Sequence, residues 1–237
     1  FESGGYIFLK NKKISLIMDV GPSPEKKFSK NYQCGALSFE IISNNKKLIC
    51  NSGYFQKTKH KLNEISKTSA THSTLIIDNH SSCKINKSKM EVESGLKIFN
   101  KKFIMEKEYW NICASHDGYS KRYGIIHERQ IKFLPKDNKF IGQDKLIKKK
   151  NFKSSNFEIR FHLEPKTKIM KTLDKKSILI DIENEGWKFT AQGYNIDIET
   201  GLYFGKKNSF TENQNLFISG ITKQEDQIVE WEFEKIA

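Results

Sequence analysis

Apolar and polar residues alternate with a period of two along most of the chain. Residues 229–234 read Val-Glu-Trp-Glu-Phe-Glu, and residues 157–163 read Phe-Glu-Ile-Arg-Phe-His-Leu. Ile178, Ile180 and Ile182 share one face of a third predicted strand. Successive side chains of a strand point to opposite faces, so the pattern is typical of antiparallel strands with one packed and one solvated face.

Turn-forming residues separate these runs. Ser43–Lys47 and Pro135–Lys139 are each expected to close a hairpin, and Glu185-Gly186 and Thr200-Gly201 predict two further tight turns. Apolar residues at helical spacing are rare over any window longer than ten residues. The sequence therefore predicts an all-β protein, a large antiparallel β-sandwich of many strands.

No linker or internal repeat divides the 237 residues, so we expect residues 1–237 to form one sandwich domain. Phe1–Leu9 is expected to lead into its first strand. Residues 55–71 and 145–156 are longer than usual hairpin loops and are either binding loops or mobile surface loops. No apolar run is long enough to cross a bilayer. The chain begins without methionine or a signal-peptide pattern, so we expect a piece of a longer protein.

The formal net charge of +13 suits an anionic polymer as partner. Only three of the 41 basic residues are arginines, namely Arg122, Arg129 and Arg160. Arginine is enriched where proteins read nucleic acid, because its planar fork forms bidentate hydrogen bonds. We therefore expect no nucleic-acid partner. Selected affinity for a polyanion and a general compositional bias toward lysine both remain open.

The four cysteines are widely spaced and form no Cys-x-x-Cys pair, which excludes a zinc ribbon and a thioredoxin-like site. Each lies in or beside an apolar stretch, where either a free buried thiol or a disulfide fits. Glycine-rich nucleotide loops and a Gly-x-Ser-x-Gly elbow are absent from the sequence, and no cofactor is expected. The cysteines are Cys34, Cys50, Cys83 and Cys113.

Three segments carry a family resemblance: residues 31–41 (Asn-Tyr-Gln-Cys-Gly-Ala-Leu-Ser-Phe-Glu-Ile), 70–78 and 116–129. Their order and spacing resemble the C-terminal β-sandwich of the heparinase II/III-like family, whose lyase members cleave acidic polysaccharides by β-elimination. Smaller pieces from Gly5–Leu9 to Val229–Phe233 extend the resemblance over most of the chain.

The resemblance implies a partner domain as well as a substrate class. In the family an α-helical toroid precedes the sandwich, and the cleft between them holds a uronate-containing polysaccharide. The toroid supplies the Tyr and the His or Asn that remove and return protons. Nothing in this chain resembles the toroid, so we expect this piece to lack it and to be inactive alone.

The resemblance also marks positions at which this chain departs from the family. Where the family carries His-x-His-x-Asp, the chain has Asn31, Gln33 and Gly35, and Asn51 replaces an expected Asp. Only His72 stands where a ligand is expected. Amides are poor zinc ligands and one histidine does not hold zinc, so no metal is expected and no catalytic residue is assigned.

Six residues are candidates for contact with substrate: His72, His116, Tyr119, Arg122, His127 and Arg129. His72 either lines the cleft or is a satisfied strand histidine. His127 and Arg129 either project toward a ligand or form a fold-supporting network in which Arg129 pairs with a carboxylate. His162 and Arg160 lie on the polar face of an alternating strand and are expected to face solvent.

The resemblance implies that the chain walls one side of an acidic-polysaccharide cleft, such as one for a glycosaminoglycan, in a bacterial carbon–oxygen lyase. The alternative is a non-catalytic carbohydrate-recognition module that has lost the lyase positions. A third reading is a structural sandwich that packs against its own N-terminal helical domain. Family analogy favours a bacterial periplasm or cell envelope.

Overall fold

Antiparallel strands make up most of the chain in the computed structural model, which describes residues 4–237 except 87 and 175. Strands account for 51% of the residues and helices for 6%, which confirms the predicted all-β class. The opening strand β1 spans Tyr6–Lys10, and Phe1–Ser3 of the expected entry lie outside the described residues. No helix among the described residues is long and apolar enough to span a membrane.

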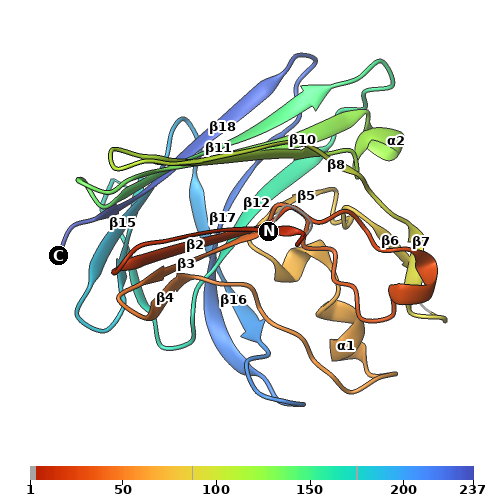
Figure 1. Cartoon of the computed structure of the whole chain (residues 1–237), viewed down its shortest axis with the longest axis horizontal. Coiled ribbons are helices and arrows are strands. Elements are labelled where there is room, and N and C mark those ends of the chain that lie inside the picture. The colour runs from red at the N-terminus through yellow and green to blue at the C-terminus, as the bar shows by residue number, and fades with distance from the viewer. Residues whose placement is uncertain (1–3, 87, 175) are drawn as a thin grey trace.

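The largest sheet has eight strands in the order β13-β14-β15-β18-β11-β10-β9-β8. In Figure 1 its strands β18, β11, β10 and β8 form the upper layer of the molecule. Its members are β8 (Ile98–Met105), β9 (Trp110–His116), β10 (Ile125–Leu134), β11 (Lys139–Lys148), β13 (Lys168–Lys171), β14 (Ser177–Asp181), β15 (Gly186–Ala191) and β18 (Gln227–Lys235).

Two four-stranded sheets lie beneath it, in the orders β1-β2-β3-β4 and β16-β17-β12-β5 (Figure 1). Besides β1 they contain β2 (Ile14–Asp19), β3 (Phe39–Ser43), β4 (Lys46–Ile49), β5 (Leu75–Ile77), β12 (Asn156–His162), β16 (Ile196–Tyr203) and β17 (Thr211–Ile221). The described helices are short: α1 (Lys61–Ile65), α2 (Ser120–Tyr123) and the 3₁₀ turns η1 (Lys26–Phe28) and η2 (Ser69–Thr71).

Aromatic side chains from all three large sheets meet in the core. Phe39 of β3 stacks on Trp231 of β18 with ring centroids 5.3 Å apart, and Phe161 of β12 meets the same indole edge-on at 5.0 Å. These rings bury large apolar areas, which drives the layers together. Gly142 of β11 makes room for the indole, because a Cβ there would lie 2.0 Å from the Trp231 ring.

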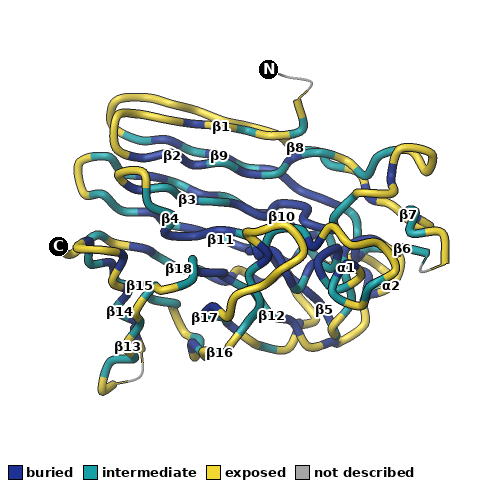
Figure 2. Tube along the Cα trace, turned by 90° about the horizontal axis from the view of Figure 1, so that it is seen from below, coloured by how far each residue is buried: buried dark blue, intermediate teal, exposed yellow. Residues whose placement is uncertain are grey.

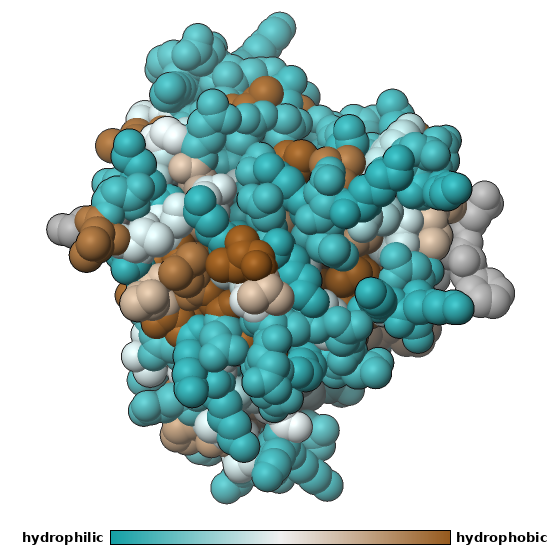
Figure 3. All heavy atoms as spheres, turned by 90° about the vertical axis from the view of Figure 1, so that its left-hand side faces the viewer, coloured by the Kyte–Doolittle hydropathy of each residue, from teal (hydrophilic) through white to brown (hydrophobic). Residues whose placement is uncertain are grey.

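The period of two read from the sequence is confirmed in the strands. Along β10 each buried residue is followed by a half-buried one from end to end. Figure 2 shows the same contrast along the chain, with largely buried central strands and exposed turns. The face drawn in Figure 3 is mostly hydrophilic, as the lysine-rich sequence leads one to expect, and its main apolar patch lies left of the centre among smaller apolar spots.

Three of the four predicted turns are confirmed and one is wrong. Asn44 and Asn45 adopt left-handed backbone angles between β3 and β4, and similar turns join β10 to β11 and β14 to β15. Gly201, however, lies inside β16. A Cβ there would lie 2.0 Å from the side-chain nitrogen of Asn215, so this glycine accommodates a neighbouring side chain rather than a turn.

The expectation that His162 and Arg160 face solvent is wrong. The backbone of Cys50 bridges to His162, and the His162 ring is buried against the Ser52 hydroxyl, 3.1 Å from its Nδ1. Arg160 bonds Glu158 and Glu199, which leaves only 13% of its side chain exposed. Other parts of the protein cover both faces of β12. The alternation of residues along one strand cannot show this, because it does not reveal what packs against the polar face.

A small separate hairpin stands beside these layers. It consists of β6 (Lys84–Asn86) and β7 (Glu91–Ser94), and Figure 1 places it beyond the right-hand end of the large sheets. The backbone N–H of Val92 donates to the Ser29 hydroxyl at 2.8 Å, which attaches the hairpin to the segment around η1. The two long stretches expected as loops are partly regular: residues 55–71 contain α1 and η2, and residues 145–148 belong to β11.

Candidate functional site

Three of the six candidate residues belong to a buried polar network in the eight-stranded sheet. His116 of β9 is paired across the strands with His127 of β10, and Arg129 of β10 with Asp144 of β11. The Asp144 carboxylate accepts hydrogen bonds from Arg129 Nε at 2.8 Å and Nη2 at 3.0 Å, and lies 2.6 Å from His127 Nε2. All four side chains are fully buried. The side chains of His116, His127 and Arg129 therefore do not reach the surface.

The electrostatics of the network fit a fold-supporting role. Burial alone would raise the pKa of Asp144, but the charge of Arg129 and the hydrogen bond of His127 outweigh it and hold the pKa far below its usual range. Burial lowers the pKa of His127 and of His116. Both imidazoles are therefore neutral, and the charged pair is Arg129 with Asp144. These contacts match the expected alternative in which Arg129 pairs with a carboxylate.

Arg129 also reaches across to the opposite layer. Its Nη1 donates to the carbonyl oxygens of Leu37 at 2.9 Å and Ser73 at 2.7 Å. Leu37 has a left-handed backbone with φ of 57°, and Ser73 directly follows His72. Arg129 is thus a positioning residue, because it fixes two backbone segments that line the cavity described next.

The positions marked by the family resemblance converge on one polar cavity of about 360 Å³. Asn31, Gln33, Asn51 and His72 all line it, although they come from three separate segments of the chain. We call this hollow the polar cavity. No Lys or Arg is among the described residues that line it, so its chemistry is that of amides, an imidazole and carboxyl groups.

His72 is held at the base of the polar cavity. Its Nδ1 lies 2.8 Å from the Thr68 carbonyl oxygen and its Nε2 lies 3.1 Å from Gln33 Oε1. Burial lowers the pKa of His72 to about 4, so the ring is neutral near pH 7. A Cβ at Gly35 would lie 2.6 Å from His72 Cδ2. A side chain at position 35, where the family carries Asp, is therefore incompatible with this position of the imidazole.

Two carboxyl groups complete the polar cavity. Glu40 accepts from the backbone and the side-chain amide of Asn51, both at 3.3 Å. Asp19 accepts from the Gly21 N–H at 2.9 Å, yet burial raises its pKa to about 7. Asp19 is therefore partly protonated near neutral pH and can either donate or accept a proton. The cavity offers hydrogen bonds to hydroxyl groups, but no cation for a carboxylate.

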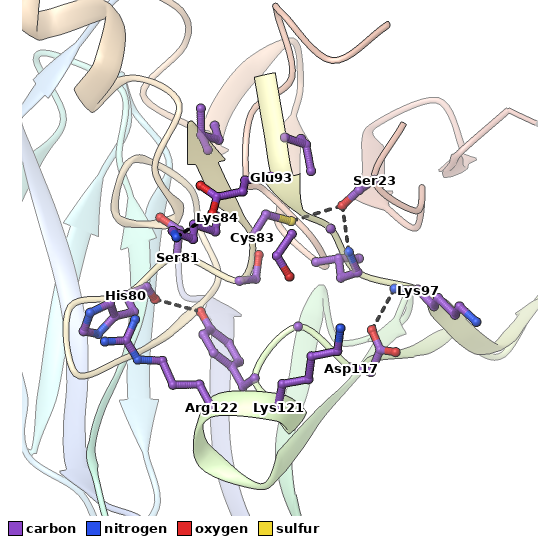
Figure 4. A pocket seen from close by; sticks show the side chains of 18 of the residues that line it. Ser23, His80, Ser81, Cys83, Lys84, Glu93, Lys97, Asp117, Lys121 and Arg122 are labelled. Atoms are coloured by element: carbon purple, nitrogen blue, oxygen red, sulfur yellow. Dashed lines mark hydrogen bonds and ion pairs between the residues drawn. The ribbon is translucent and has the colours of Figure 1, made fainter. Parts of the chain in front are cut away.

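A second, larger hollow of about 1200 Å³ lies between the β6–β7 hairpin, the segment before η1 and helix α2 (Figure 4). Lys84 on its rim pairs with Glu93 at 2.7 Å, and Asp117 accepts from the Lys97 N–H at 2.7 Å. Four other cationic side chains line it and have no salt bridge within the part of the chain that the structure describes: Lys26, Lys97, Lys121 and Arg122. We call this hollow the basic groove.

Tyr119 and Arg122, the remaining candidates, both line the basic groove but differ in exposure. Tyr119 is buried, and its hydroxyl donates to the carbonyl oxygen of Leu75 at 2.8 Å. Arg122 is exposed and stacks its guanidinium over the Tyr123 ring, 5.6 Å from the centroid. Figure 4 shows Arg122 beside His80 on one wall, and Lys121 reaching into the groove near Asp117.

Sequence reasoning did not single out Lys97, Lys121 or His80 as site residues. His80 accepts or donates a 2.6 Å hydrogen bond with the Tyr123 hydroxyl, which fixes the wall on which Arg122 stacks. The only available signal was the abundance of lysine, which does not distinguish one lysine from another. Within the described residues, no group of three or more His, Cys, Asp or Glu side chains is arranged to hold a metal ion.

Comparison with known proteins gives a consistent result. The family model described as "Heparinase II/III-like, C-terminal" matches residues 1–232. The structure is similar to that of the heparan sulfate lyase HepC from Pedobacter heparinus, with a TM-score of 0.81 at 14% identity over 98% of this chain. It is also similar to a heparinase III, with a TM-score of 0.75 at 16% identity over 99% of this chain.

This chain covers only 35% of the length of each of these two lyases. At such low identity the likeness shows a shared sandwich fold. A search of curated proteins finds no match.

We expect Asp144→Asn to destabilise the fold by about 3–5 kcal/mol, because it leaves the Arg129 charge buried without its counter-ion. Urea denaturation followed by tryptophan fluorescence measures the effect. Glu93→Gln is the matched control, since it breaks the exposed Lys84–Glu93 pair and should cost less than about 1 kcal/mol. Equal losses for the two variants would contradict a supporting role for the network.

We also expect stability to fall on mild acidification. Burial lowers the pKa of His72 to about 4 and of His162 to about 3, and lowers those of His116 and His127. Between about pH 6.5 and pH 4 the unfolded chain binds protons at His72 and His162 that the folded chain does not bind, so the free energy of unfolding decreases by up to about 1.4 kcal/mol per pH unit for each of these two residues. His116 and His127 act in the same direction.

Two carboxyl groups modify this dependence. Asp19 opposes the loss of stability on acidification, because its raised pKa makes the folded state bind the extra proton. It is a single carboxyl group, whereas four histidines act in the other direction. Below about pH 4 the depressed pKa of Asp144 adds to the loss, since the unfolded carboxyl is protonated first. Urea midpoints at about pH 7, 6 and 5 test the prediction. His72→Gln should flatten the slope, and a constant midpoint would refute it.

Proposed function

The chain belongs to the heparinase II/III-like family as its C-terminal domain, and on that premise we propose that it forms one wall of a cleft that binds a uronate-containing acidic polysaccharide. We further propose that residues 1–237 act as one domain, and that the parent protein is a carbon–oxygen lyase whose helical N-terminal domain forms the opposite wall. The observation that carries the proposal is the basic groove: four cationic side chains line it, and none of them forms a salt bridge within the described residues.

The basic groove suits a polymer whose anionic groups recur along its length. Lys97 lies in the loop just before β8, and Lys121 and Arg122 lie on α2, so the cations come from separate parts of the groove wall. Carboxylates or sulfates on successive sugars can therefore meet successive cations. Stacking on Tyr123 holds the Arg122 guanidinium in place, which reduces the entropy lost when it binds an anion.

The polar cavity supports a complementary role toward uncharged groups. The side chains of Asn31, Gln33 and Asn51 offer both donors and acceptors, which fits the hydroxyls of a sugar ring.

Tyr32 connects the two hollows, because it lines the polar cavity while its hydroxyl accepts from Ser23 of the groove at 3.5 Å. We propose that one saccharide chain contacts both hollows, with Arg122 binding an anion and His72 supporting the cavity.

Elimination from a uronic acid requires three tasks. The carboxylate must be neutralised, a base must take the adjacent proton, and an acid must protonate the departing oxygen. In this chain the cations lie in the basic groove, whereas Asp19, with its pKa near 7, lies in the polar cavity. Because these groups are not in one hollow, we propose that the proton-transferring groups come from the helical domain of the parent.

One observation favours a second function, recognition of a carbohydrate without catalysis. Amides at Asn31, Gln33 and Asn51 cannot exchange protons, and His72 occupies the space that a side chain at position 35 would need. These departures support a parent protein that binds the polysaccharide but no longer cleaves it.

We expect Lys121→Ala/Arg122→Ala to weaken binding of heparin and of alginate oligosaccharides roughly threefold to thirtyfold at low salt, since each exposed cation contributes up to about 1 kcal/mol. Isothermal titration calorimetry at two salt concentrations measures the change. The matched control is Lys12→Ala/Lys13→Ala, which removes the same charge from the exposed β1–β2 turn, at the opposite end of the molecule in Figure 1. Equal weakening by both double variants would mean that net charge alone drives binding.

The isolated chain should produce no unsaturated uronate from heparan sulfate, alginate or other uronate polymers, because we assign the proton-transferring groups to the helical domain of the parent. Ultraviolet absorbance of the unsaturated product provides the assay. A clear rise would overturn our assignment of proton transfer to another domain. Cleavage by the full-length parent would exclude the purely recognising alternative.

A further inference from the structure

Two cysteines that are 49 positions apart in the sequence meet between the polar cavity and the basic groove. Cys34 and Cys83 are 1% and 7% exposed, and with Ala36 and Leu96 they form a small apolar cluster separate from the main core. The Cys34 Sγ lies 3.8 Å from the carbonyl oxygen of Cys83, and both side chains pack in this cluster. The two cysteine side chains are therefore close neighbours.

The backbone on both sides of this pair is fixed by one buried hydroxyl. Ser69 Oγ donates to the carbonyl oxygen of Cys34 at 2.6 Å and accepts from the N–H of Ser82 at 3.0 Å. Ser69 is fully buried, so this connection is shielded from water. The two cysteine-bearing segments are thus held side by side before any covalent bond forms.

The two thiols differ in access and in acidity. Cys83 lines the basic groove, where its Sγ lies 3.1 Å from Ser23 Oγ and 3.8 Å from the Tyr32 hydroxyl; Figure 4 shows it directed toward Ser23. The neighbouring Cys34 thiol, aided by Ser23 and Tyr32, lowers the pKa of Cys83 to about 7. The Cys83 thiol, together with burial, raises the pKa of Cys34. Cys83 is therefore the attacking thiol and Cys34 the resolving one.

The other two cysteines have different surroundings. Cys50 is fully buried, and burial raises its pKa far above the usual range. Cys113 is half-buried on β9, and burial raises its pKa as well. All four thiols are free in the structure, and in the described chain only Cys34 and Cys83 contact each other.

We propose that Cys34 and Cys83 are a dithiol modification site, which closes to an intramolecular disulfide when the chain meets a protein or small-molecule disulfide as oxidant. The Cys83 thiolate attacks one sulfur of the oxidant, forms a mixed disulfide and releases one oxidant thiolate. Cys34 then attacks Cys83 Sγ, its proton goes to the first released thiolate, and the second oxidant sulfur leaves as a thiolate, which takes up the proton that Cys83 gave to water when it ionised. The two cysteines lose two electrons in total, and the oxidant is reduced to two thiols.

The disulfide would join the base of the β6–β7 hairpin to the segment that carries Tyr32 and Gln33. That hairpin is a two-stranded sheet of its own, and it walls the basic groove. Closing a loop of about 50 residues restricts the unfolded chain and fixes the hairpin against the body. The site therefore couples the thiol redox state to the rigidity of the groove wall.

The test is oxidation of the whole chain with oxidised glutathione, followed by thiol counting after denaturation and by peptide mapping. We expect the number of free thiols to fall from four to two, and a cross-linked peptide that contains Cys34 and Cys83. The melting temperature should rise by about 5–10 °C on oxidation. Four remaining thiols, or a different cysteine pairing, would overturn the proposal.

Matched variants separate the proposed roles of the two thiols. Cys34→Ser should leave Cys83 trapped as a glutathione adduct with no rise in melting temperature, because the resolving thiol is gone. Cys113→Ser should form the cross-link as the unchanged chain does. If Cys34→Ser showed the same rise in melting temperature, or if Cys83→Ser still lost two thiols, the assignment would be wrong.

Discussion

A buried carboxylate, that of Asp144, organises the polar interior of this sandwich. Its two oxygens accept hydrogen bonds from Arg129 and from Trp231 Nε1 and contact His127. Removing a charge from water is costly, so the carboxylate is stable only when these partners hold their positions. Because Arg129 then binds the carbonyl oxygens of Leu37 and Ser73, the constraint passes from the eight-stranded sheet to the opposite layer. The network therefore shapes the polar cavity without lining it.

The surface near this network divides into two chemically different hollows. The polar cavity holds amides, a neutral imidazole and carboxyl groups, whereas the basic groove holds cations from the β6–β7 side and from α2. A polymer that carries both hydroxyls and regularly spaced anions matches this division. The Cys34–Cys83 pair lies where the two hollows adjoin, so the cross-link that we propose would act on the connection between them.

The two lyases have the same sandwich fold as this chain although few residues are identical. The sandwich is shared at 14–16% identity, which is possible because alternating apolar positions and tight turns specify strands without requiring particular residues. Polar positions are more specific. The packing of Gly35 depends on His72, since the imidazole fills the space that a side chain at position 35 would need. A departure from the family pattern at one position is thus explained by the conformation of another.

The alternating pattern predicted the fold class and the strands that were read from it, and the turn residues predicted three of the four turns, because alternation and the left-handed backbone at Asn44 and Asn45 are local properties of the chain. The sequence by itself could not decide whether a polar strand face meets water or protein. His162 and Arg160 were therefore placed wrongly, and the two alternatives for Arg129 stayed open until Asp144 was seen beside it. Folding brings Lys97, Lys121 and Cys83 to one groove, which no local pattern indicates, since burial and charge clustering depend on segments that are distant in the chain.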